Sequence, residues 1–184
     1  MMRIITGRAR GAKLFTLEGE NTRPTSERVK EAVFSMIQFE IEGRAVLDLF
    51  AGSGQMALEA VSRGASEAVM IDSSKDAVGI IKKNIEKTKL GDSCQVFCAD
   101  YASALSRMEG RRKFDIVFLD PPYKAGALAP ALKQLRKYDL LKPTSIIVCE
   151  SADDGFLSSV GELYEVKKTA RYGVACVTLL KIKE

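Results

Sequence analysis

The sequence predicts an α/β fold, a doubly wound and mostly parallel seven-stranded sheet that finishes in an antiparallel hairpin. Through the middle of the chain, short apolar runs alternate with stretches of helical periodicity. This alternation is typical of βαβ units, in which helices cover both faces of a parallel sheet. Near the end of the chain, two strand-like runs follow each other across a tight Tyr172-Gly173 corner, which indicates a hairpin.

The elements are expected in a regular order. The expected strands are residues 44–50, 67–72, 94–100, 113–120 and 145–151, followed by the hairpin 163–171 and 173–183. The expected helices are residues 55–63, 75–88, 101–108 and 126–138. Ser73 or Ser74 is placed to cap the second of these helices, because a serine hydroxyl accepts from the free N–H groups of a first turn.

The front of the chain has a different pattern. Residues 1–15 are expected to form a short basic β-ribbon, and residues 23–38 an amphipathic helix with Thr25 or Ser26 as its cap. The apolar residues of this helix recur at i, i+3, i+4, i+7 and i+8, namely Val29, Ala32, Val33, Met36 and Ile37. We therefore expect an N-terminal extension, residues 1–38, in front of a larger domain, residues 39–184.

Composition narrows the class of protein. A hydrophobic content of 46% with 28% charged residues is ordinary for a globular domain, and no run approaches the length of a membrane span. The N-terminus lacks the apolar core of a signal peptide, so we expect a cytoplasmic protein. With four cysteines, no Cys-x-x-Cys pair and no histidine, the chain is expected to bind no metal and to keep its thiols reduced.

The net charge of +4 is unevenly distributed. The first 13 residues contain four basic side chains and no acidic one, and residues 107–113 contain four more beside the single Glu109. Clusters of this kind favour a polyanionic partner, although solvated basic loops look the same in sequence.

A glycine-rich stretch, "DLFAGSGQMA" (48–57), follows the first expected strand. Gly52 and Gly54 permit a tight turn that lets backbone approach a ligand, and the next helix offers free N–H groups at its start. Asp48 and Phe50 belong to the same candidate cofactor site. The spacing also satisfies the relaxed fingerprint of NAD-binding proteins, and a glycine turn that serves packing alone has the same appearance.

Acidic residues end the next two strands. Asp72 lies 18 residues after Gly54, where its carboxylate can accept from both ribose hydroxyls of an adenosine. Asp100 is placed either to reach an adenine amino group or to cap the following helix. Ser73 and Tyr101, which follow these two acids, complete the candidate cofactor residues. Adenosine binding is expected, but at this point NAD and S-adenosylmethionine both remain open.

The fourth strand ends in "DPPY", residues Asp120, Pro121, Pro122 and Tyr123. Together with the glycine turn, the acidic strand ends and the terminal hairpin, this tetrapeptide makes the chain resemble the Rossmann-like class I S-adenosylmethionine-dependent methyltransferases. It resembles in particular those that methylate exocyclic amino groups of nucleic-acid bases. The resemblance implies S-adenosylmethionine as the cofactor and Asp120 to Tyr123 as the catalytic loop.

Four stretches narrow the resemblance further. "MRIITGRARGAKL", "TRPTSERVKEAVF", "LDLFAGSGQMALEAVSRGA" and "FDIVFLDPPY" together resemble the RsmD family of bacterial 16S rRNA guanine-N2 methyltransferases. Gln55 and Met56 depart from the small apolar residues expected after the turn, at positions on which the chemistry does not depend. The resemblance implies methylation of a guanine N2 amine in 16S rRNA of the small ribosomal subunit.

The loop composition suits amine methylation. An exocyclic amine is a weak nucleophile whose lone pair is delocalised, and acceptors on its N–H groups orient that lone pair. The Asp120 carboxylate and the Pro121 carbonyl are candidate acceptors, and the prolines fix φ so that both are held in place. Tyr123 offers a face on which the base can stack.

Substrate recognition is expected to fall to the small basic extension. Arg23 and Arg28 are the leading candidates for RNA contact, followed by Arg8 and Arg10. An enzyme with so little recognition apparatus suits an RNA whose own folded shape supplies specificity, and we expect it to act as a monomer. The alternatives are a DNA or RNA adenine-N6 methyltransferase, a non-catalytic rRNA-binding assembly factor, and a nicotinamide-dependent dehydrogenase.

Overall fold

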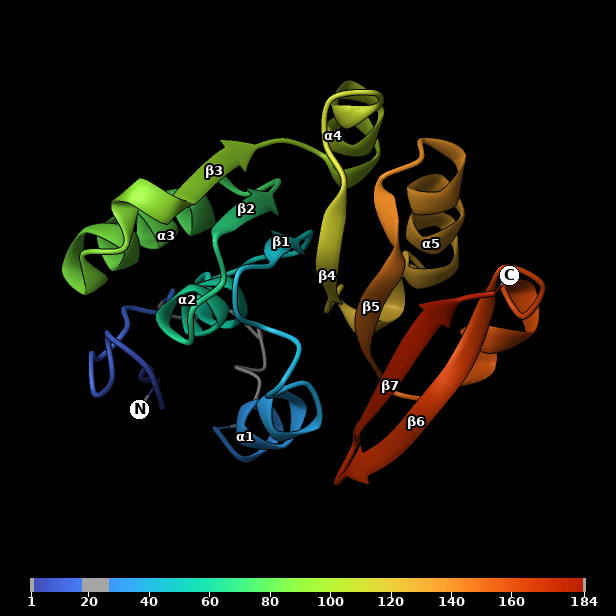
Figure 1. Ribbon diagram of the computed structural model, residues 1–184, viewed down its shortest axis with the longest axis horizontal. Coiled ribbons are helices and arrows are strands. Elements are labelled where there is room, and N and C mark those ends of the chain that lie inside the picture. The colour runs from blue at the N-terminus through green and yellow to red at the C-terminus, as the bar shows by residue number, and fades with distance from the viewer. Residues whose placement is uncertain (1, 18–26, 184) are drawn as a thin grey trace.

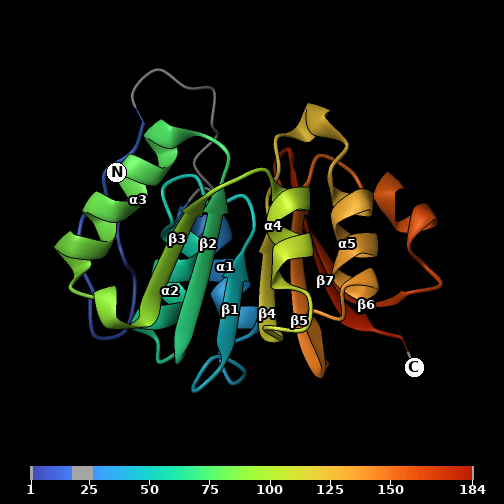
Figure 2. The ribbon, with the colours of Figure 1, turned by 90° about the horizontal axis from the view of Figure 1, so that it is seen from above.

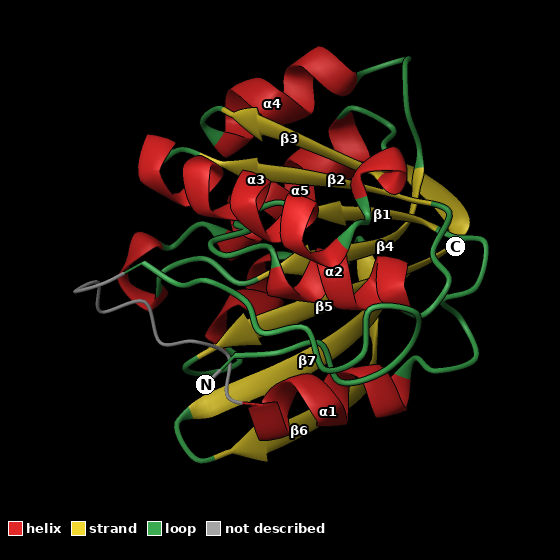
Figure 3. Ribbon diagram, turned by 90° about the vertical axis from the view of Figure 1, so that its left-hand side faces the viewer, coloured by secondary structure: helices red, strands yellow, loops and turns green. Residues whose placement is uncertain are grey.

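A single seven-stranded sheet, in the order β3-β2-β1-β4-β5-β7-β6, forms the centre of the molecule (Figures 1 and 3). The computed structural model describes residues 2–17 and 27–183. The strands are β1 (Ala45–Asp48), β2 (Glu67–Asp72), β3 (Cys94–Cys98), β4 (Phe114–Leu119), β5 (Leu141–Ser151), β6 (Tyr164–Tyr172) and β7 (Ala175–Ile182). Strands β1 to β5 run parallel, and β7 pairs antiparallel with both β5 and β6. The predicted mixed sheet and its terminal hairpin are confirmed.

The helices lie in two layers. They are α1 (Glu27–Met36), α2 (Gln55–Ser62), α3 (Lys75–Thr88), α4 (Tyr101–Met108) and α5 (Leu128–Lys137), with 3₁₀ turns at Gly91–Ser93, Tyr123–Ala125 and Gly155–Ser159. Apolar residues of α1, α2 and α3 share one core with one face of the sheet, while those of α4 and α5 share a second core with the other face. Figure 2 shows α4 and α5 in front of the sheet and α1 behind it. This arrangement confirms the doubly wound architecture.

The strand order indicates that ligands bind at the carboxyl edge of the sheet. Strand β1 pairs on one side with β2 and on the other with β4; the chain runs from β1 through β2 to β3 on one side and then crosses to β4 on the other side of β1. In such open sheets, ligands bind beyond the carboxyl ends of the strands at the point where the strand order reverses. The glycine turn follows β1 and the Asp120–Tyr123 loop follows β4, so both lie at this point.

Several strand boundaries differ from the sequence-based expectation by one to four residues. The first strand ends at Asp48 and not at residue 50, because Leu49 and Phe50 already belong to the turn that leads into α2. The fifth strand begins at Leu141 and not at residue 145. Leu141 pairs with Phe114 across an irregularity in the β4–β5 ladder, and this long-range pairing extends the strand through Pro143.

The N-terminal segment is a ribbon only in part. Arg3 and Lys13 form one isolated antiparallel bridge, and three further backbone bonds join the two arms. The predicted helix at 23–38 is observed as α1 from Glu27, while Arg23 and the candidate caps Thr25 and Ser26 lie outside the described residues.

Buried polar side chains attach this ribbon to the sheet domain. The Glu59 carboxylate in α2 is fully buried and accepts from the N–H groups of Ile5 and Thr6, at 2.8 and 3.0 Å. It also lies 3.7 Å from the buried Lys30 ammonium of α1. Burial lowers the pKa of Lys30, and the neighbouring Glu59 charge opposes that shift. The ribbon and α1 therefore share a charged contact with α2.

Within the described residues, no helix has the length and apolar character needed to cross a membrane. All four cysteines are free of disulfide bonds; Cys149 and Cys176 are buried, whereas Cys94 is half-buried and Cys98 is exposed.

Candidate active site

The glycine turn is held between the ends of two neighbouring strands. The Leu49 N–H donates to the Phe118 carbonyl at 3.2 Å, and the Ala51 N–H donates to the Ile71 carbonyl at 2.9 Å. Gly52 and Gly54 have φ values of 56° and 77°, in the left-handed region that glycine adopts without strain. A Cβ on Gly54 would lie 3.0 Å from the Met70 sulfur, so that this position excludes a side chain on two grounds.

The turn leaves space for a ligand. A Cβ built on Gly52 meets nothing within 4 Å, so open space lies above its backbone. Helix α2 starts at Gln55 with Gly54 as its N-cap, and no side chain caps it. Its first N–H groups and positive dipole end therefore point toward the carboxyl edge of the sheet, an arrangement that suits a polar ligand.

Asp72 is part of the turn's own hydrogen bonding. One carboxylate oxygen accepts from the Gly52 N–H at 2.8 Å and the other accepts from the Ser74 N–H at 2.9 Å. A carboxylate offers about four acceptor positions, so these two bonds orient it and leave capacity for ribose hydroxyls. Asp72 ends β2, as its spacing from Gly54 predicts. The hydrogen bond that it accepts from the Gly52 N–H was not predicted from the sequence.

Asp48 lies beneath the turn. It is only 3% exposed, and its carboxylate accepts from the Ala57 N–H at 3.4 Å. Burial raises the pKa of Asp48 to about 7, and the negative charge of Asp72 adds to the shift. A carboxyl group with this pKa is close to half-ionised near neutral pH, so a cationic ligand beside it would favour its charged form.

Asp100 acts as a helix cap. Its carboxylate accepts from the Ser103 N–H at 2.9 Å, and this bond lowers the pKa of Asp100. The capping alternative is therefore present, and the exposed carboxylate still faces solvent at the end of β3. Beside it, the rings of Phe50 and Tyr101 pack with centroids 5.3 Å apart, which joins the ends of β1 and β3 by an aromatic wall.

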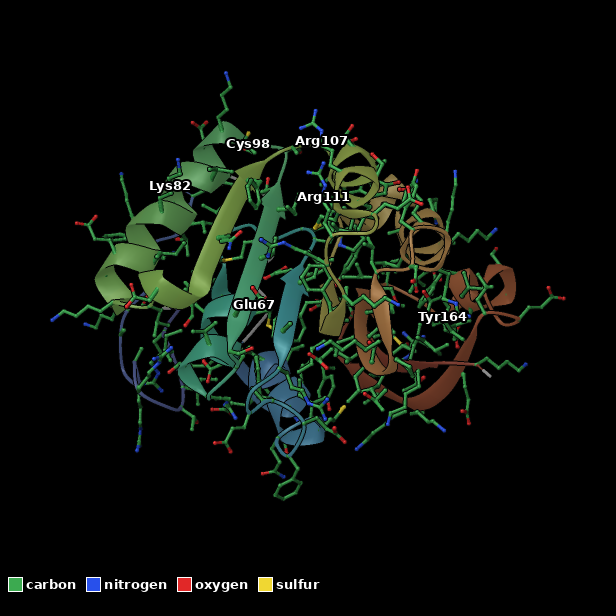
Figure 4. The ribbon with its side chains drawn as sticks, turned by 45° about the horizontal axis from the view of Figure 1, so that its top comes forward. Glu67, Lys82, Cys98, Arg107, Arg111 and Tyr164 are labelled. Atoms are coloured by element: carbon green, nitrogen blue, oxygen red, sulfur yellow. The ribbon has the colours of Figure 1, made fainter. Side chains whose placement is uncertain are left out.

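Sequence reasoning missed Cys98 at this end of the site. Figure 4 labels it at the end of β3, and its thiol donates to the Ser73 carbonyl at 3.7 Å. The exposed Ser73 is thus held at the rim next to Asp72. A cysteine that ends an exposed strand has no distinctive sequence signal, which is why it was not singled out.

The Asp120–Tyr123 loop lies beside the turn because β4 pairs with β1. Pro121 is buried and Asp120 is half-buried, whereas Tyr123 remains 37% exposed. The Tyr123 hydroxyl donates to the Glu150 carboxylate at 3.2 Å. Glu150 comes from the end of β5 and is the main functional candidate that sequence reasoning missed. Its signal was an acidic residue directly after the buried run "SIIVC".

A pocket of about 310 Å³ opens next to this loop. It is lined by Pro121 to Tyr123, by the start of α5, by the segment from Glu150 to Asp153, and by Phe156. The walls combine proline and aromatic surfaces with a few acidic groups. This combination suits a flat aromatic ligand that has hydrogen-bond donors on its edge.

The candidate RNA-binding arginines lie apart from the loop. The Arg8 N–H donates to the Ser62 carbonyl at the end of α2, and the Arg8 guanidinium donates to the Ser93 hydroxyl at 3.4 Å. Helix α2 starts at the glycine turn and has 8 residues, so the ribbon tip with Arg8 and Arg10 lies about 12 Å further along the helix axis. Arg28 is exposed on α1, and Arg23 is outside the described residues.

The basic residues 107–113 are separate from the candidate RNA-binding arginines of the N-terminal extension. Figure 4 places Arg107 and Arg111 at the far end of α4. In the described part of the chain, no cluster of three or more His, Cys, Asp or Glu side chains is arranged to hold a metal ion.

Comparisons with known proteins identify the family of the chain. The family described as conserved hypothetical protein 95 matches residues 2–181. Ribosomal RNA small subunit methyltransferase D from Haemophilus influenzae is 35% identical over 83% of this chain and 80% of its own length. The Escherichia coli protein of the same name is 33% identical over 86% of this chain and 79% of its own length.

A solved structure extends the likeness to the whole fold. The protein yhhF from Escherichia coli superposes with a TM-score of 0.88 at 31% identity, and the alignment covers 99% of this chain and 98% of that one. The fold is therefore the Rossmann-like class I methyltransferase fold. Since the family match runs from residue 2 to residue 181 and the named relatives share about a third of its residues, the chain belongs to the RsmD family.

Proposed function

We propose that the protein transfers a methyl group from S-adenosylmethionine to the exocyclic N2 amine of a guanine in 16S rRNA of the small ribosomal subunit. The observation that carries this proposal is that two segments lie side by side: the Leu49 N–H at the start of the glycine turn donates to the carbonyl of Phe118 in β4, two residues before Asp120. This contact supports a cofactor role for the glycine turn and an amine-binding role for the neighbouring Asp120–Tyr123 loop. The names of the relatives support rRNA as the substrate class.

The residues around the turn fit S-adenosylmethionine. The open space over Gly52 admits the ligand, the Asp72 carboxylate can accept from its ribose, and the Phe50–Tyr101 wall can flank its adenine. Asp48 lies beneath, where a cationic ligand would favour the charged form of its carboxyl group. When bound, S-adenosylmethionine supplies a methyl group activated by its positively charged sulfur. Ser73, Asp100 and Tyr101 complete the rim of this site.

The loop residues act on the base. Asp120 and the Pro121 carbonyl accept from the two N–H bonds of the amine and turn its lone pair toward the methyl group. Pro121 and Pro122 restrict the backbone, so little reorganisation is needed during transfer. Tyr123 stacks on the base at the pocket mouth, a contact worth about 1–3 kcal/mol. The methyl transfer then depends mainly on positioning.

The N-terminal extension, residues 1–38, would hold the RNA while the domain of residues 39–184 performs the transfer. The distance between the Arg8–Arg10 tip and the glycine turn, about one helix length, supports a broad footprint on the RNA. Arg28, which is exposed on α1, and Arg23 are proposed as further RNA contacts. We propose that a monomer carries all of these groups.

The test is direct. The protein is incubated with methyl-labelled S-adenosylmethionine and small-subunit particles that lack the modification, and the rRNA is digested to nucleosides. The expected product is N2-methylguanosine. Label in N6-methyladenosine or in DNA would replace the proposed substrate, and binding to particles without label would favour the assembly-factor reading. Calorimetric titration with S-adenosylmethionine and with NAD separates the two cofactors.

A further inference from the structure

The pocket beside the catalytic loop contains a carboxylate that the transfer chemistry does not use. Leu119 of β4 pairs with Cys149 of β5, so Asp120 and Glu150 follow directly on two adjacent parallel strands. Neighbouring strands lie about 4.8 Å apart, which places the two acidic residues side by side at the carboxyl edge. Asp120 serves the amine in the proposed function. Glu150 has no role there.

The position of Glu150 is rigid. Its backbone belongs to β5 and pairs with Val177 of β7, and the preceding Cys149 pairs with Leu119 of β4, so Glu150 is held by the sheet rather than by a loop. The carboxylate lines the 310 Å³ pocket and accepts from the Tyr123 hydroxyl at 3.2 Å. That bond orients the carboxylate relative to the stacking ring, and a carboxylate accepts from more than one donor at a time.

The two purines present different edges to such a group. Guanine carries its N2 amine next to an N1–H, so two donors lie side by side. Adenine carries its N6 amine next to N1, which is an acceptor. Asp120 and the Pro121 carbonyl bind an amine of either purine, so the tetrapeptide alone does not choose between them. A second carboxylate next to the first one favours the purine with a second donor and repels the lone pair of an acceptor.

We infer that this pocket, with Asp120 next to its Pro121 wall, is a guanine-selective base site, in which Glu150 accepts a hydrogen bond from N1–H while Asp120 holds the N2 amine. The inference rests on the proposed function and deepens it by assigning the choice of base to one residue. Tyr123 stacks on the base and fixes Glu150 through its hydroxyl. Asp153 also lines the pocket, but its carboxylate accepts from the Gly155 N–H at 2.8 Å within its own loop.

The experiment varies the N1 and C6 positions of the base while keeping the C2 amine. A small-subunit RNA is prepared with guanine, 2,6-diaminopurine or 2-aminopurine at the methylated position, and the rate of methyl transfer is measured at limiting RNA. Both analogues keep the C2 amine but replace N1–H by an acceptor. The native protein is expected to prefer guanine by about 10- to 100-fold, as expected for a charged hydrogen bond that is replaced by a repulsion.

The variant Glu150→Gln is expected to reduce that preference to about threefold or less, because an amide can either donate or accept. The control is Asp154→Asn, which removes the same charge from an exposed position in the adjacent loop and is expected to keep the full preference. The affinity of Glu150→Gln for S-adenosylmethionine, measured by calorimetry, is expected to match that of the native protein and shows that the variant is folded.

The possible failures are distinct. If the native protein methylates no guanine in any RNA, the proposed function is wrong. If it methylates guanine and both analogues equally, or if Glu150→Gln keeps the full preference, the assignment of base selection to Glu150 is wrong while the methyltransferase activity stands.

Discussion

The carboxyl edge of the sheet has two parts that are built in different ways. The cofactor half is the glycine turn with Asp48, Asp72 and Asp100, and the base half is the Asp120–Tyr123 loop with Glu150. Around the glycine turn, each candidate carboxylate accepts from a backbone N–H nearby in the chain, with Gly52 and Asp72 only 20 residues apart as the most distant pair. In the base half, the side chain of Tyr123, in the turn after β4, meets that of Glu150 in β5. Hydrogen bonds from backbone N–H groups to carboxylates shape the first half, whereas a contact between two side chains joins the segments of the second.

Because of this difference, substitutions in the two halves should have different effects. A turn made of left-handed glycines and backbone hydrogen bonds tolerates few changes of residue type. A substitution that distorts this turn should weaken cofactor binding. A pocket made of side chains from two strands can lose one group and still fold, so its loss should affect chemistry and selectivity. The following substitutions separate these two kinds of effect.

The largest effect is expected for Asp120→Ala in the base half. Removing the acceptor that orients the amine should lower kcat by about 10²- to 10³-fold or more, in line with the loss of a preorganised group. The affinity for S-adenosylmethionine should remain within about twofold, since the glycine turn is intact. Single-turnover transfer and calorimetry measure the two quantities. Turnover near the native rate would remove Asp120 from the mechanism.

The matching test in the cofactor half is Gly54→Ala. The left-handed backbone and the Met70 sulfur 3.0 Å from the new Cβ should force the turn to shift. We expect S-adenosylmethionine affinity to fall by about 10-fold or more, from a strain of roughly 1–3 kcal/mol. Gly43→Ala is the control, because Gly43 also has a positive φ, 72°, but meets nothing within 4 Å. It should lower stability while leaving cofactor affinity unchanged.

Asp48 predicts a pH dependence of stability in the cofactor-free protein. Its pKa is about 7 in the folded state and lies near the ordinary carboxyl value in the unfolded state. Between these values the folded state binds more protons, so the free energy of unfolding should fall as pH rises from 5 to 8. Denaturant titrations should show a decline on the order of 2 kcal/mol that Asp48→Asn removes. An unchanged slope in that variant would assign the decline to other groups.

The smallest effects concern Tyr123. Replacing it by leucine removes the stacking face and should lower kcat/KM by about 10-fold, whereas phenylalanine keeps the ring and should cost about two- to fivefold. The phenylalanine variant loses only the hydroxyl bond to Glu150. Steady-state kinetics on small-subunit RNA measures both. Equal losses in the two variants would show that the hydroxyl matters more than the ring.

Much of the cofactor half could be predicted because its signals are local. Gly52 and Gly54 stand where a left-handed turn needs them, and Asp72 ends the neighbouring strand at the expected spacing. Asp100 was expected either to bind ligand or to cap a helix, and its bond to Ser103 shows the cap. A residue that bonds within its own turn leaves a pattern in a short window of sequence.

The rest depends on contacts between distant segments. Residues 1–15 were expected to form a ribbon, but their docking on the buried Glu59 of α2 has no signal in either segment alone. The early start of β5 at Leu141 likewise follows from its pairing with Phe114. Such contacts arise only when the sheet is assembled.

By itself, the sequence determined the alternating α/β pattern, the terminal hairpin, the glycine turn and the Asp120–Tyr123 loop, because hydrophobic periodicity and special backbone residues act over a few positions. Only the tertiary structure decided which groups surround that loop. Strand order places β5 beside β4, and this pairing brings Glu150 to Tyr123 across 27 positions of the chain. The choice of base, if it lies with Glu150, is therefore a property of the assembled sheet.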